Sequence, residues 1–151
     1  MKINILGLDD VLVEEIIKLY IDDKHFEYIT DEHCIEYRIG SISMFTKERL
    51  NYFRESNVKF FKDTCGVIIL FRASNKDDIK NIWFNELLHN LEKTVPILFL
   101  EIEDDQHKTM NSDFLKTFYK NYDKVNHSVI KKNKYIIKMV LDRLIKRVSN
   151  L

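Results

Sequence analysis

The sequence predicts an α/β protein, a three-layer α/β/α sandwich in which helices cover both faces of a sheet. Two apolar runs, Val67 to Phe71 and Val95 to Leu100, carry this prediction. Neither run alternates with polar residues, so each is typical of a strand buried on both sides. Elsewhere, apolar residues recur at helical spacing. Buried strands that alternate with amphipathic helices are the pattern of this fold class.

The first part of the chain is expected to form a strand, a turn and a helix. Lys2 to Leu6 is the strand, Gly7 to Asp10 the turn, and Val11 to Tyr20 the helix, with apolar residues at helical spacing. The acidic segment 22–32 is expected to be an irregular surface loop. After it, the sequence predicts one antiparallel hairpin of two strands, Cys34 to Arg38 and Ser41 to Phe45.

The rest of the chain is expected to alternate between helices and strands around the two apolar runs. The charged segment from Thr46 to Lys62 suggests a loop and a short helix. A polar turn that ends at Gly66 precedes the strand expected at Val67 to Phe71. The remaining expected elements are a helix from Lys76 to Leu91, a strand from Val95 to Leu100, a helix around Phe114 to Tyr119, a strand from Lys124 to Ile130 and a helix from Asn133 to Val148.

Composition favours one globular domain. At 151 residues, with 45% hydrophobic and 32% charged residues, the chain can bury a substantial core. It contains no apolar segment of about 18 residues, so no integral membrane segment is expected. Cys34 and Cys65 have neither zinc-site nor disulfide-framework spacing. These features favour a reducing, cytoplasmic setting.

Charge is distributed unevenly although the net charge is zero. Residues 1–36 hold ten acids and three lysines, a formal charge of −7, whereas residues 116–151 hold ten basic residues and two acids, a formal charge of +8. Two interpretations stay open: the ends serve a charged partner, or they pack together and neutralise each other.

Several short motifs resemble those of Arf and Arf-like small GTPases. Gly7-Leu8-Asp9 resembles the GLDxxGKT phosphate loop, Ile35-Glu36-Tyr37 is similar to the VEY that opens the interswitch hairpin, and Asp63-Thr64-Cys65-Gly66 resembles NTxG. Between the hairpin motif and the NTxG-like motif, this sequence has no insertion or deletion relative to the family pattern. The likeness covers roughly Ile3 to Asp104. The resemblance implies a single domain over residues 1–151 with a small-GTPase-like mixed six-stranded sheet and one antiparallel hairpin.

The nucleotide chemistry of that family is missing at three places. The phosphate-loop Gly-Lys-Thr-Thr corresponds to Leu12-Val13-Glu14-Glu15, where carboxylates would oppose a triphosphate. The two glutamates could instead stabilise the positive end of their own helix. The switch-two Trp-Asp-Val-Gly-Gly corresponds to Phe45-Thr46-Lys47-Glu48-Arg49, followed by Leu50 in place of Gln. The base-reading Asn-Lys-x-Asp corresponds to Glu101-Ile102-Glu103-Asp104. We therefore expect no cofactor and no enzymatic activity.

The resemblance implies a non-catalytic pseudo-GTPase that acts as a protein–protein interaction or scaffolding subunit of a larger assembly. The family presents an aromatic patch to its partners, and the matching positions are Phe45, Phe60 and Thr30, of which the last departs from the aromatic pattern. Burial of both phenylalanines in the core is an equal alternative. Two other functions stay open: a divergent GTP-binding GTPase or nucleotide sensor in vesicle trafficking, and an unrelated α/β adaptor.

Other clusters give weaker signals. The acidic and histidine cluster formed by Glu101, Glu103, Asp104, Asp105 and His107 could bind a hard cation, but a solvated loop explains it better because no EF-hand pattern is present. Cys65 fits a packing role better than a nucleophile. The basic last helix fits an ordinary solvated helix, so no nucleic-acid partner is expected and only peripheral contact with a membrane is left open.

Overall fold

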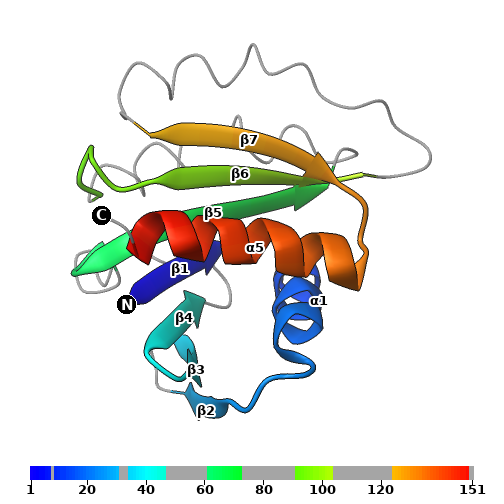
Figure 1. Ribbon diagram of the computed structural model, residues 1–151, viewed down its shortest axis with the longest axis horizontal. Helices are drawn as coiled ribbons and strands as arrows, with labels where there is room; N and C mark the ends of the chain where they lie inside the picture. The colour runs from blue at the N-terminus through cyan, green and yellow to red at the C-terminus, as the bar shows by residue number, and fades with distance from the viewer. Residues whose placement is uncertain (8, 31–33, 47–60, 73–90, 104–123, 150–151) are drawn as a thin grey trace.

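The computed structural model describes residues 1–7, 9–30, 34–46, 61–72, 91–103 and 124–149 (Figure 1). Seven strands form one mixed sheet, in the order β2-β3-β4-β1-β5-β6-β7. Two described helices accompany the sheet. The elements are β1 (Lys2–Leu6), α1 (Asp10–Ile21), β2 (Glu27–Thr30), β3 (Ile35–Ile39), β4 (Ile42–Thr46), β5 (Thr64–Arg72), β6 (Ile97–Ile102), β7 (Val125–Ile130) and α5 (Lys134–Ser149).

The sheet is parallel around β1 and antiparallel at one end. β1 pairs in parallel with β4 and β5, and the parallel pairing continues through β6 to β7. β3 is antiparallel to both β2 and β4. Gly40 takes a φ of +58° in the turn between β3 and β4, a left-handed conformation that glycine adopts without strain. β1, which comes first in the chain, therefore lies in the interior of the sheet.

Both described helices pack on one face of the sheet (Figure 1). Ile16 and Ile17 of α1, together with Ile137 and Leu141 of α5, are at most 1% exposed and pack against alternate strand residues in one hydrophobic cluster. The intervening strand residues point to the opposite face, and they are also buried: Leu6, Val67, Ile69, Phe71, Ile97 and Phe99. Burial on both faces explains why β5 and β6 are continuous apolar runs.

The expected number of strands was wrong. We expected six strands with one hairpin, but the sheet contains seven, and β2, β3 and β4 form two antiparallel pairs in succession. The additional strand, Glu27–Thr30, lies in the segment that was expected to be an acidic loop. All four of its residues are exposed. Pairing with β3 along the backbone makes this segment a strand, and such pairing leaves no burial pattern in the sequence.

The other expected elements within the described residues are confirmed with shifts of a few residues at their ends. β1 has the expected bounds, and α1 extends the expected helix by one residue at each end. β5 begins at Thr64, inside the expected turn, because Thr64 and Gly66 already pair with β1. The helices expected at Lys76 to Leu91 and Phe114 to Tyr119, and with them the third layer, lie outside the described residues. Neither described helix is long and apolar enough to cross a membrane.

Candidate functional site

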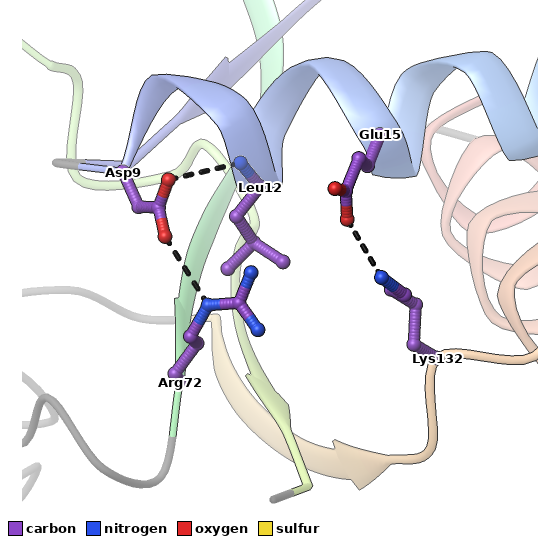
Figure 2. A network of polar contacts seen from close by, with 5 residues as sticks. All are labelled: Asp9, Leu12, Glu15, Arg72 and Lys132. Atoms are coloured by element: carbon purple, nitrogen blue, oxygen red, sulfur yellow. Dashed lines mark hydrogen bonds and ion pairs between the residues drawn. The ribbon is translucent and has the colours of Figure 1, made fainter.

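The junction between β1 and α1 is where the sequence placed a degenerate phosphate loop. α1 begins at Asp10, and only three residues separate it from the end of β1. Asp9 is the N-cap residue, with an extended backbone, and its Oδ1 accepts a hydrogen bond of 3.0 Å from the Leu12 N–H (Figure 2). A free helix N-terminus attracts anions because its first N–H groups lack partners. Here a carboxylate of the chain itself occupies that position.

Arg72, the last residue of β5, completes this anion site. Its Nε donates to Oδ2 of Asp9 at 3.1 Å, so the two carboxylate oxygens have different partners (Figure 2). Burial works to raise the pKa of Asp9, but the hydrogen bond from Leu12 and the guanidinium of Arg72 outweigh it and hold the pKa below its usual value. Asp9 is therefore a charged cap with a charged partner.

The start of the junction is closely packed. A methyl group added at Gly7 would lie 2.8 Å from Cγ2 of Val13 and 3.0 Å from the backbone oxygen of Leu70. Leu12 and Val13, at the positions of the family's Gly and Lys, are buried in the hydrophobic cluster. Apolar side chains thus fill the region beneath the junction, where the resembled motif has residues that bind phosphate.

The two glutamates do not cap the N-terminus of α1. We expected Glu14 and Glu15 either to oppose a phosphate or to stabilise the helix N-terminus. Instead Glu14 pairs with Lys18 one turn further along α1, at 2.7 Å, and Glu15 pairs with Lys132, at 2.8 Å (Figure 2). Both belong to the second turn of α1, beyond the unpaired N–H groups. Asp9 therefore caps the helix in their place.

A small pocket opens between α1 and the β2–β3–β4 segment. Its volume is about 90 Å³, and the residues that line it are Asp10, Val11, Val13, Glu14, Tyr28, Ile35, Tyr37 and Thr46. Among these lining residues there are two carboxylates and no lysine or arginine. Pockets for drug-sized ligands usually measure about 300–1,000 Å³. The pocket is thus small, and the charged side chains of its described lining are acidic, which opposes phosphates.

The predicted partner-binding residues do not lie on one surface of the described chain. Thr30 pairs with Ile35 and so shares a face with Thr46, whereas Phe45 pairs with Glu36 and with Asn4 and points to the opposite face. Thr30 is exposed. Phe45 is half-buried, with Nζ of Lys2 4.9 Å from its ring centroid. Phe60 lies outside the described residues.

Part of the predicted acidic and histidine cluster lies within the described residues. Within the described ranges, no group of three or more metal-ligating side chains is found. Glu101 is fully buried, and its Oε1 lies 3.4 Å from Nε2 of His127. Asp104, Asp105 and His107 of the predicted acidic cluster lie outside the described residues, as do Lys47 to Leu50 of the switch-two motif. Within the described residues, neither Cys34 nor Cys65 forms a disulfide.

The opposite charges at the two ends of the chain meet at the contact between α1 and α5. Lys132 pairs with Glu15, Lys134 with Asp22, and Lys138 with Asp23 at 2.6 Å. The Tyr20 hydroxyl also donates to Asp142 at 2.6 Å. Of the two interpretations left open by the sequence, mutual neutralisation is the one that these residues support.

Sequence reasoning missed the role of Arg72. Nothing near Arg72 in the sequence indicates a pair with Asp9, which lies 63 residues earlier. The available signal was topological, since β1 and β5 were both expected to be strands of one α/β sheet, each followed by a helix. Parallel neighbours bring the residues after their carboxyl ends to the same edge of the sheet.

Comparison with models of known protein families finds no match to this chain, and comparison with curated proteins finds none either.

Proposed function

We propose that this chain is a non-catalytic, Arf-like pseudo-GTPase that does not bind GTP and acts as a protein–protein interaction or scaffolding subunit of a larger assembly. The observation that carries the proposal is the pairing of Asp9 with the N-terminus of α1 and with Arg72. A phosphate at the end of β1 would need the same N–H groups.

The arrangement of the sheet supports the Arf-like assignment. Without β2, the strand order is β3-β4-β1-β5-β6-β7, which has six strands, a hairpin at one edge and the first strand in the interior. The mixed sheet and the β3–β4 hairpin are features that the resemblance implies, whereas the count of six is reached only when β2 is left out. Burial of both faces of β5 and β6 further favours a third layer opposite α1 and α5.

Charge and space both argue against a triphosphate. The pocket beside the N-terminus of α1 is about 90 Å³ and is lined by Asp10 and Glu14. At a separation of about 4 Å and an effective dielectric constant of about 20, two like charges repel by about 4 kcal/mol. Displacing Asp9 would in addition remove the helix cap, at a cost of about 1 kcal/mol.

Isothermal titration of the full chain with GTP, GDP and ATP in the presence of Mg²⁺ tests the loss of nucleotide binding. We expect no binding heat, and we expect no nucleotide to be released when the purified protein is denatured. Micromolar binding of any of the three would instead favour the divergent GTPase or nucleotide sensor.

The interaction role is tested separately by purification of the tagged chain with its partners from its native cell. We expect the double variant Phe45→Ala, Phe60→Ala to lose a partner that the wild type retains. Tyr135→Ala is a matched control because it removes an exposed aromatic side chain from α5, away from Phe45 and Thr30. If the double variant keeps the partner, or if it unfolds as judged by circular dichroism, the predicted aromatic surface is wrong.

A further inference from the structure

The two flanks of α5 carry cations that differ in their partners. Lys134 and Lys138 lie on the flank toward α1, and each has a carboxylate partner there. Arg143 and Arg147 lie about 140–180° around the helix from these lysines, on the flank toward β7. Over the part of the chain that the structure describes, no hydrogen bond or ion pair involves either arginine. The basic charge of α5 is therefore neutralised on one flank only.

These arginines border a pocket between α5 and the edge strand β7. The pocket has a volume of about 160 Å³. Asn126 and Ser128, two residues apart on β7, contribute polar side chains on the face toward α5, and Leu98, Val140 and Leu144 contribute apolar ones. The remaining lining residue, His127, also stacks on Phe71. The pocket thus combines two exposed guanidinium groups with neutral hydrogen-bonding side chains.

The chemistry of this pocket matches carboxylates. A guanidinium presents a planar set of donors that fits a carboxylate with two parallel hydrogen bonds. Asn126 and Ser128 can donate to the same anionic group. On its other flank, α5 already binds the carboxylates of Glu15, Asp22 and Asp23 through its lysines and Lys132.

We propose that the pocket between α5 and β7, bordered by Arg143 and Arg147, binds an acidic segment of a protein partner. Carboxylates of that segment pair with the two arginines, as Asp22 and Asp23 pair with Lys134 and Lys138 on the opposite flank. This inference deepens the proposed interaction function, but it uses a surface that is separate from Phe45 and Thr30.

A fluorescently labelled decaglutamate peptide is a direct probe for this site. Fluorescence anisotropy with the full chain at low ionic strength should show binding that weakens as salt is added. The double variant Arg143→Gln, Arg147→Gln should weaken binding by at least about tenfold, which corresponds to about 1.4 kcal/mol. Lys93→Gln, Lys146→Gln is the matched control because it removes the same charge from exposed positions that do not line the pocket, and it should change binding less than about twofold.

Three results would overturn the inference. They are an absence of decaglutamate binding to the wild type, an equal loss of binding in both double variants, and tighter arginine-dependent binding of a single-stranded DNA 20-mer or phosphatidylserine vesicles than of the peptide. Thermal unfolding of each variant, followed by circular dichroism, separates a loss of the site from a loss of the fold. Because no nucleotide is involved, failure here is distinct from failure of the nucleotide titration.

Discussion

The carboxylate of Asp9 is shared between a helix end and a strand end: Oδ1 accepts from the Leu12 N–H and Oδ2 from Nε of Arg72. One side chain therefore joins the start of α1 to the end of β5 across 63 residues of sequence. The pair is about one-third exposed. Solvent at that exposure screens the ionic contribution, so the hydrogen bond to the helix end contributes most of the stabilisation.

Substitution of Asp9 should distinguish the cap from the ion pair. Asp9→Ala removes both and should lower the free energy of unfolding by about 1–2 kcal/mol. Asp9→Asn keeps an oxygen that can accept from Leu12 but loses the charge, so it should cost about 0.5 kcal/mol. Urea denaturation measures both values. Glu14→Gln on the exposed face of the same helix is the control and should stay within about 0.5 kcal/mol of the wild type. Equal costs for Ala and Asn would show that the ion pair dominates.

Gly7 should not tolerate a side chain. Gly7→Ala places a methyl group against Val13 and the backbone of Leu70, and it should destabilise the protein by about 1–3 kcal/mol. Combining it with Val13→Ala should cost less than the sum of the two single changes, because Cγ2 of Val13 is then absent. A double-mutant cycle in urea measures this coupling. Additive costs would mean that the backbone of Leu70 alone sets the limit.

Tyr20 should make stability decrease at high pH. Burial, and then the hydrogen bond to Asp142, raise the pKa of Tyr20 well above its usual value. The unfolded chain loses this proton near pH 10 while the folded chain keeps it, so the contribution of Tyr20 is full below about pH 10 and is lost as the pH rises further. Tyr20→Phe should cost about 1 kcal/mol at pH 7. The gap between the two proteins should narrow above pH 10 in chemical denaturation, and a constant gap would contradict this account.

The contact between α1 and α5 should depend on salt. The triple variant Glu15→Gln, Asp22→Asn, Asp23→Asn removes the three carboxylates that pair with Lys132, Lys134 and Lys138. We expect a loss of about 1–2 kcal/mol at low ionic strength and a smaller loss in 1 M NaCl, where the Debye length is about 3 Å. Thermal unfolding at both salt concentrations measures it. An unchanged difference would mean that packing, rather than charge, holds the two helices together.

Elements with a burial signal were predictable from the sequence. The apolar runs of β5 and β6 predict buried strands, and the helical periodicity of α1 and α5 predicts amphipathic helices. β2 was missed because its pairing with β3 uses backbone groups, and its side chains Glu27, Tyr28, Ile29 and Thr30 remain exposed. We expected the turn before β5 to end at Gly66, whereas the strand already begins at Thr64. Thr64 pairs with Lys2, and because neither residue is apolar the sequence gives no signal of this pairing.

The candidate site was predictable in outline but not in detail. Alignment with the family motif was enough to show that the phosphate-loop residues are replaced and that acidic residues lie near the N-terminus of α1. The assignment of Asp9 rather than Glu14 or Glu15 as the cap depends on where α1 begins, and helix starts are uncertain by a few residues when several acids lie in succession. The partner of Asp9 depends on strand order, which periodicity does not encode.

The ion pairs between α1 and α5 also constrain the order of folding. Their partners are separated by more than 110 residues, as for Lys132 with Glu15 and Lys134 with Asp22. During synthesis α1 emerges long before α5, so its acidic flank stays hydrated and unpaired until almost all of the described chain is available. β1 must likewise wait for β4 and β5 on its two sides. Closure of such distant contacts makes folding slow, and the last helix to be made completes the environment of the first.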